Sequence, residues 1–114
     1  RRKTMTVQKL VDILQATTVY EADFSREVTG GYAGDLLSFV MGRAPINSAW
    51  YTVMTNVNVI AVAVLTEVSV VVLCEGCAPD ELLVARAEMQ AVNVIRTDLD
   101  IYQAISKVCD ADTL

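Results

Sequence analysis

The stretch VNVIAVAVLTEVSVVVLC, residues 57–74, decides the fold of this chain. It is apolar enough to be mistaken for a membrane span, but polar residues interrupt it, namely Asn58, Thr66, Glu67 and Ser69. A charged residue near the middle of a span would cost about 2.5–3.5 kcal/mol. The stretch therefore favours two shorter buried elements over one membrane helix.

The boundary between these two elements follows from length. A continuous strand over 50–74 would be implausibly long, so we place a break at Thr55 and Asn56. With Asn56 as N-cap, a buried helix is expected to run to about Val68, followed by a central strand at 70–74. Valine is a poor intrinsic helix former, so this helix must be stabilised by its burial.

The rest of the chain supplies elements on both sides of this pair. Apolar spacing predicts helices at 6–15, 35–41, 79–90 and 98–109, and β-branched or aromatic runs predict strands at 19–20, 28–32, 49–54 and 92–95. We expect Thr6 to cap the first helix, Gly42 to end the second in a left-handed conformation, and Gly30–Gly31 to end the second strand. Packing positions of the last two helices are expected at Leu82, Leu83, Ala85 and Met89, and at Leu99, Tyr102, Ile105 and Val108.

The order of these elements indicates the fold class. Alternating helices and strands are typical of an α/β domain, with a mostly parallel sheet covered by helices on both faces. The composition, 54% apolar but only 6% aromatic, suits strands buried on both sides. We expect one domain over 6–114, after a tail, residues 1–5, that is solvated or remains from a tag.

The charge balance excludes several classes of partner. The net charge is −5, and without Arg1, Arg2 and Lys3 the remaining six basic and fourteen acidic residues give −8. Such a chain repels phosphate backbones and has no basic stripe, so we expect no nucleic-acid partner. The odd number of cysteines, three, argues against a secreted disulfide framework and favours a cytoplasmic location.

The segment GGYAG, residues 30–34, is the first candidate binding loop. It lies between a predicted strand and a predicted helix, where backbone amides and the helix dipole can receive an anion. Neither a Lys-Ser or Lys-Thr pair nor a G-x-G-x-x-G pattern accompanies it. The alternative role is structural, because glycine permits positive φ and close packing. Thr29, Gly30 and Gly31 are therefore candidate ligand contacts.

Polar residues after the third, fourth and fifth predicted strands complete the candidate site. In chain order they are Asn56, Asn58, Glu75, Gly76, Arg96 and Thr97. Loops at the carboxyl ends of parallel strands line the usual ligand crevice. Capping alone explains Asn56, whereas Asn58 in an apolar helix start needs a partner. Arg96 can bind a carboxylate or phosphate, or pair with Glu75 or Asp98.

Few residues are suited to catalysis. The chain has no histidine, which excludes a Ser-His-Asp or Cys-His site within it. Cys74 and Cys77 have the C-x-x-C spacing of redox dithiols and of half a zinc site, but only Cys109 remains to complete one. Cys74 also suits a buried strand position. We expect no catalytic residue, no metal and no cofactor.

Several separated motifs resemble those of the DRTGG domain family. They are Arg26 with Val28-Thr29-Gly30-Gly31, the segment DLLSFVMG at 35–42, Asn58 with AVA, Glu75-Gly76 before PDE, and Arg96-Thr97. The resemblance covers 6–108 and departs from the family pattern at Ser25, where the family has Asp. It implies a three-layer α/β/α domain with a mostly parallel open sheet, like the N-terminal domain of HPr kinase/phosphorylase. Such modules occur alone or beside CBS, phosphotransacetylase and pyrophosphatase domains, with regulatory roles.

Two functions are compatible with these features. One is a non-catalytic regulatory domain that binds a small anionic ligand, such as a nucleotide, at the carboxyl ends of the strands. The alternative is a dimerisation or protein-interaction module, because a small apolar-rich domain has a face that needs covering. A homodimer or another protein partner is then expected. The serine kinase labels of some family members find no phosphate loop, metal-binding Asp pair or base in these residues.

Overall fold

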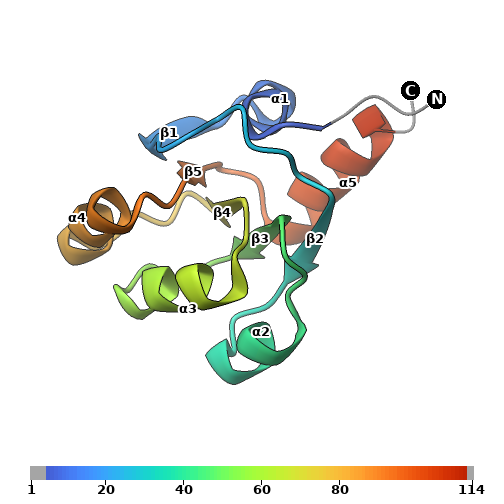
Figure 1. Cartoon of the computed structure of the whole chain (residues 1–114). Coiled ribbons are helices and arrows are strands. Elements are labelled where there is room, and N and C mark those ends of the chain that lie inside the picture. The colour runs from blue at the N-terminus through green and yellow to red at the C-terminus, as the bar shows by residue number, and fades with distance from the viewer. Residues whose placement is uncertain (1–4, 113–114) are drawn as a thin grey trace.

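A computed structural model of the chain describes residues 5–112 (Figure 1). Its elements, in chain order, are α1 Val7–Leu14, β1 Thr17–Tyr20, β2 Gly30–Ala33, α2 Leu37–Arg43, β3 Ser48–Thr52, α3 Asn58–Thr66, β4 Val70–Leu73, α4 Glu81–Gln90, β5 Val94–Arg96 and α5 Ile101–Asp112. Residues 1–4 of the expected tail lie outside the described residues. Met5, which was also assigned to the tail, accepts a hydrogen bond from the Val28 amide at 2.8 Å.

The five strands form one mixed sheet in the order β1-β5-β4-β3-β2. Strands β2, β3, β4 and β5 are parallel, with Gly30 opposite Ser48 and Ala49 opposite Val70, while β1 pairs antiparallel with β5. The predicted α/β class and mostly parallel sheet are therefore confirmed. Because the four parallel strands run in one direction, their carboxyl ends share a single edge of the sheet.

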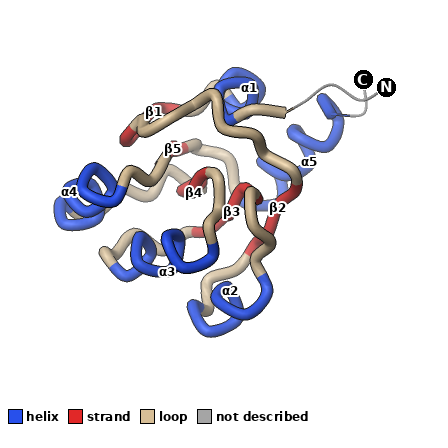
Figure 2. Tube along the Cα trace, in the orientation of Figure 1, coloured by secondary structure: helices blue, strands red, loops and turns tan. Residues whose placement is uncertain are grey.

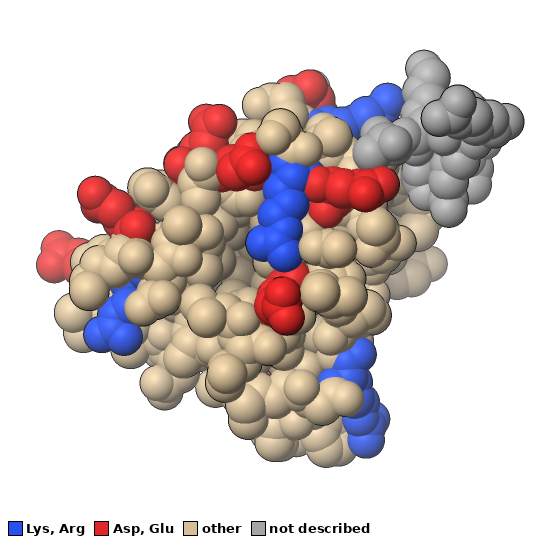
Figure 3. Space-filling model, in the orientation of Figure 1, with Lys and Arg blue, Asp and Glu red and all other residues tan. Residues whose placement is uncertain are grey.

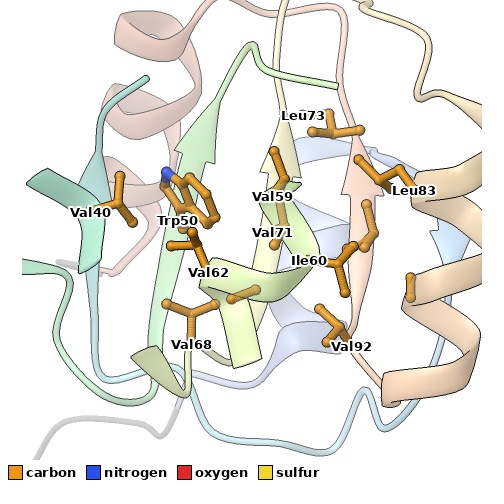
Figure 4. Packing of buried hydrophobic residues seen from close by; sticks show 13 residues of the cluster. Val40, Trp50, Val59, Ile60, Val62, Val68, Val71, Leu73, Leu83 and Val92 are labelled. Carbon is orange, nitrogen blue, oxygen red and sulfur yellow. The ribbon is translucent and has the colours of Figure 1, made fainter. Parts of the chain in front are cut away.

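Helices cover both faces of the sheet, which gives three layers (Figures 1 and 2). One apolar cluster joins the sheet to α2, α3 and α4, and contains Val40, Trp50, Ile60 and Leu83. Figure 4 shows the Trp50 side chain of β3 beside Val40 and Val62. The second cluster joins the opposite face to α1 and α5 through residues such as Leu10, Val72 and Ala104.

The valine-rich stretch folds as two elements, as the sequence predicts. Helix α3 buries Val59, Ile60, Val62 and Ala63 against the sheet, and all four residues of β4 are buried. Between them Glu67 adopts a left-handed conformation with φ 57°, which turns the chain from the helix into the strand. Alternate residues of β4 enter opposite clusters, so this strand has a core on each face.

Several predicted boundaries are wrong, including the starts of α4 at Glu81 and of α5 at Ile101 in place of 79 and 98. Gly30 and Gly31 begin β2 instead of ending it, because they pair with Ser48 and Ala49. Gly42 lies inside α2, which is capped by Ala44 with φ −67°, so no left-handed glycine ends this helix. Val57 occupies the N-cap of α3 in place of Asn56, and the helix ends at Thr66, two residues before the expected Val68. By contrast, Thr6 caps α1 as predicted and accepts from the Lys9 amide.

Four expected packing residues are exposed, and Ala85 of α4 is one of them. Leu82 and Met89 of α4 are 70% and 75% exposed, and Tyr102 of α5 is 81% exposed. The apolar pattern of α4 is nearly uniform around the helix, so spacing alone could not identify its inner face. That face consists of Leu83 and Ala87, which are fully buried. In residues 5–112 no helix combines the length and the apolar character needed to span a membrane.

Candidate functional site

The carboxyl edge of the sheet gathers six of the nine predicted site residues. Strands β3, β4 and β5 end at this edge, so the loops that follow them meet there. These loops and the start of α3 contain Asn56, Asn58, Glu75, Gly76, Arg96 and Thr97. Helices α3, α4 and α5 also begin at this edge, so the positive ends of their dipoles point to it.

The loops after β4 and β5 are joined through their backbones. The Glu75 amide donates to the carbonyl oxygen of Leu99 at 2.8 Å, and the Gly76 amide donates to that of Thr97 at 2.9 Å. Glu75 and Gly76 have φ of 62° and 66°, and the Cys77 amide donates to the Cys74 carbonyl, as in a tight turn with two left-handed residues. Both amides are thus used within the protein, and neither is available to an anion.

Arg96 is the basic side chain of this edge. One of its Nη atoms donates to the carbonyl oxygen of Gly76 at 2.9 Å, and the side chain is half-buried. The expected alternative was an ion pair with Glu75 or Asp98, but the described bond goes to a backbone carbonyl. A guanidinium has five N–H donors, so this bond orients the group and leaves donors for a ligand.

Asn56 and Asn58 lie at the start of α3, beside these loops. Asn56 Oδ1 accepts from the Asn58 amide at 2.9 Å, so Asn56 satisfies an early helix amide although it is not the N-cap. Both side chains are exposed. The expectation that Asn58 is enclosed by apolar residues and needs a partner is therefore wrong, because water satisfies an exposed amide. It stays a predicted ligand contact.

Asp35 belongs to the same edge and is missing from the sequence-based site. It follows β2, where its Oδ1 accepts from Thr52 Oγ1 at 2.6 Å and from the Val53 amide at 2.9 Å. Nearby, Trp50 Nε1 donates to the Gly34 carbonyl at 3.0 Å. Apolar spacing predicts Asp35 as the first residue of a helix, whereas α2 begins at Leu37. The signal that could have revealed it is a carboxylate that directly follows glycine at the end of a strand.

The remaining predicted residues, Thr29, Gly30 and Gly31, lie away from this edge. They enter β2 at its amino end, and both the amide and the hydroxyl of Thr29 donate to the Asn47 carbonyl. A Cβ on Gly31 would lie 3.2 Å from Cε1 of Tyr51, so this glycine provides space for a buried aromatic ring. Their position supports the structural alternative for the glycines, and a ligand role for them is untested.

Arg26, in the family-like motif, holds the amino edge together. It donates to Asn47 Oδ1 at 3.1 Å and to the Glu67 carbonyl oxygen at 2.7 Å. These bonds tie the loop before β2 to the turn before β3 and the end of α3. Ser25 replaces the family's Asp, and both its hydroxyl and its backbone amide donate to Asp23 Oδ1. These two hydrogen bonds, the hydroxyl's first, lower the pKa of Asp23.

Asn93 is a buried polar group of the amino edge. Its Oδ1 accepts from the amides of Ala22 and Asp23, each at 2.8 Å, and its Nδ2 donates to the carbonyl oxygens of Asp23 and Ser69 at 2.8 and 2.9 Å. The side chain is only 3% exposed. Every hydrogen-bonding position of the amide is therefore used for structure, and sequence analysis gave no indication of this network.

The C-x-x-C motif does not have the properties of a reactive dithiol. Cys74 is buried, and burial, followed by the charges of Glu75 and Asp100, raises its pKa to about 12. Cys77 is partly exposed and precedes α4 by several residues. Within 5–112, no group of three or more His, Cys, Asp or Glu side chains is placed to hold a metal ion.

The charge of the carboxyl edge is mainly negative. Asp35, Glu75, Asp80 and Asp98 are exposed on its loops. The Asp98 carboxylate lies against Gly76, because a Cβ added to Gly76 would lie 2.9 Å from Asp98 Oδ1. Fixed negative charge disfavours a free anion at this edge. It is compatible with an anion that carries its own cation.

The fold occurs in the regulatory region of a known enzyme. No family model matches the chain, and no curated protein sequence matches it. Among solved structures, the chain is similar to the CBS and DRTGG domains of the regulatory region of Clostridium perfringens pyrophosphatase, complexed with its activator diadenosine tetraphosphate. The TM-score is 0.76 at 14% sequence identity, over 90% of this chain and 45% of that one. The likeness at this identity concerns the fold, and the fold of the chain is that of a DRTGG-like domain.

Proposed function

We propose that this chain is a non-catalytic regulatory domain, in the cytoplasm, that binds a small anionic ligand such as a nucleotide at the carboxyl edge of its sheet. The observation that carries the proposal is the structural match to a regulatory region complexed with a nucleotide activator. That region contains CBS as well as DRTGG domains, and this chain spans less than half of it. The proposed position of the ligand therefore rests on features of this chain alone.

Three features of the carboxyl edge support a ligand there. Arg96 is oriented by its bond to the Gly76 carbonyl and presents further donors. The exposed amides of Asn56 and Asn58 lie at the start of α3. Helix α4 starts at this edge, so its first amides point towards it, and Asp80, its N-cap, makes no side-chain capping bond to them.

The acidic residues of this edge define the form of the ligand. Carboxylates beside Arg96 repel a bare polyphosphate, whereas Mg²⁺ in nucleotide sites is held by one or two carboxylates together with the phosphates. Asp98 and Glu75 flank the loop to which Arg96 donates. We therefore propose that the nucleotide is bound with a divalent cation.

Thermal unfolding with nucleotides tests this function. Adenine mono-, di- and triphosphates and diadenosine tetraphosphate are compared with and without Mg²⁺. A ligand present at about 100 times its dissociation constant stabilises a protein by about 2.7 kcal/mol, which raises the Tm of this small domain by several degrees. Arg96→Gln is expected to abolish the shift. Arg43→Gln, at the far end of α2, is the matched control and should preserve it.

A flat response to every nucleotide, or a shift that Arg96→Gln leaves unchanged, would contradict a carboxyl-edge nucleotide site. The Mg²⁺ comparison separates two outcomes. A shift without added cation would retain the site but reject the cation-bound form of the ligand.

A second candidate function, a protein-interaction module, is favoured by the surface of one helical layer. Of the nine large apolar side chains that are exposed among the described residues, eight belong to α2, α3, α4 or the adjoining loops. Figure 3 shows that the lower part of the molecule, over α2 and α3, is largely free of charged side chains. Exposed apolar side chains gathered on one layer are typical of interaction sites.

A further inference from the structure

Helix α4 is apolar on two opposite sides. Its inner side, Leu83 and Ala87, is fully buried against the sheet. Its outer side carries Leu82, Ala85 and Met89, all exposed, with Leu82 and Met89 at 70% and 75%. The spacing of these three residues, i, i+3 and i+7, is that of the a and d positions of a coiled-coil seam. A surface helix of a monomer would carry polar residues there.

Charged residues flank this outer seam in a definite pattern. With Leu82 at position a, the heptad assigns Ala85 to d and Met89 to the next a. The flanking positions are then Glu81 and Glu88 at g, and Arg86 at e. All three charged side chains are exposed. One flank of the seam is therefore acidic, and the other is basic at its centre.

This pattern distinguishes between the two ways in which two copies of α4 can pair. Parallel helices related by a two-fold axis place each g residue against the e residue five positions further along the partner. Glu81 of one copy then faces Arg86 of the other, and symmetry gives two such pairs. Antiparallel helices would instead place glutamate against glutamate and arginine against arginine. The charges are complementary only in the parallel arrangement.

The surroundings of α4 also suit a second copy. Helix α4 lies at one end of the α2–α3–α4 layer (Figure 1), where its outer side is not shielded by another element. Neighbouring α3 has no charged residue over Asn58–Thr66 and exposes Val64 and Leu65, so this part of the layer adds no charge to the contact.

We propose that α4 mediates self-association: a second copy of the chain packs its α4 parallel to the first across a two-fold axis. Leu82, Ala85 and Met89 form the seam, the small Ala85 allows close approach, and Glu81 and Arg86 pair between copies. This proposal rests on the protein-interaction function and locates it. Because α4 presents only three seam residues, the contact belongs to the small, weak class of interfaces, and we expect a dissociation constant in the micromolar range or weaker.

Sedimentation equilibrium from about 1 to about 300 µM brackets that affinity. We expect Leu82→Ser and Met89→Ser each to weaken the dimer at least about tenfold, because each loses an apolar contact in both copies. Glu81→Arg and Arg86→Glu alone should weaken it as well. The double variant Glu81→Arg/Arg86→Glu should restore it, since the pairs are then exchanged. The control Tyr102→Ser removes an exposed aromatic on the opposite layer and should have no effect.

Three results would overturn the proposal. A chain that is monomeric throughout this range would remove both self-association and the α4 contact. A dimer insensitive to Leu82→Ser and Met89→Ser would keep the interaction function but place it on another surface. A dimer that the double charge exchange fails to restore would reject the parallel arrangement. Circular dichroism establishes that each variant is folded, which these exposed positions favour.

Discussion

Removal of the Asn93 side chain is expected to destabilise the domain strongly without affecting the carboxyl edge. Its amide makes four hydrogen bonds that attach residues 22 and 23 to the start of β4 and β5. A net hydrogen bond is worth about 0.5–1.5 kcal/mol, and a buried group left without a partner costs about 1–3 kcal/mol. The carbonyl of Ser69 lies in the buried part of the network, while Asp23 is exposed and can be rehydrated.

These contributions predict that Asn93→Ala lowers the free energy of unfolding by about 3 kcal/mol. Urea denaturation followed by circular dichroism measures this value, and an unchanged m-value would show that unfolding remains two-state. Asn58→Ala is the matched control, because that amide is exposed, and we expect less than about 0.5 kcal/mol. A loss below about 1 kcal/mol for Asn93→Ala would show that the network does not hold the loop.

Four further predictions concern single positions. Ala91→Gly should raise stability by about 0.5–1 kcal/mol in thermal unfolding, because Ala91 caps α4 with φ 55°, a conformation that suits glycine; no gain would refute this. Ser48→Ala should be neutral or stabilising, because Ser48 Oγ is the one buried side-chain nitrogen or oxygen atom in the described residues that has no hydrogen-bond partner. A clear loss of stability would reveal a missed partner. Gly76→Ala should destabilise by about 1–2 kcal/mol, because φ is 66° and its Cβ would contact Asp98; an unchanged urea midpoint would argue against that turn. Iodoacetamide at pH 8 should label the exposed Cys109 and spare the buried Cys74, whose pKa is raised by folding to about 12. The contribution of the Cys74 thiol to stability is therefore complete at neutral pH and is lost as the pH rises towards 12. Labelling of Cys74 in the native protein would refute both statements.

The division of the valine-rich stretch could be predicted because two independent limits agree. A single strand would be too long, and the polar residues from Thr66 to Ser69 mark the turn that the structure places at Glu67. The position of six site residues at the carboxyl edge could be predicted from the topology, because parallel strands bring their carboxyl ends to one edge of the sheet. Local signals combined with topology were sufficient for these features.

Other features depend on pairing partners that the sequence does not reveal. Two consecutive glycines predict the end of a strand, yet Gly30 and Gly31 pair with Ser48 and Ala49 and therefore belong to β2. The inner face of α4 is decided by which residues meet the sheet, since both sides of that helix are apolar. The Asn93 network joins residues about 70 positions apart, a contact that spacing along the chain cannot indicate.

Nuclear magnetic resonance of the ¹⁵N-labelled chain, titrated with diadenosine tetraphosphate and Mg²⁺, tests the regulatory site most directly. The amide signals of Asn56, Asn58, Gly76 and Thr97 and the side-chain signal of Arg96 are expected to shift together and saturate. The amide signals of Thr29 and Gly30, at the opposite end of β2, should remain in place. Shifts confined to the amino edge, or no saturable shift at the carboxyl edge, would contradict a ligand site there.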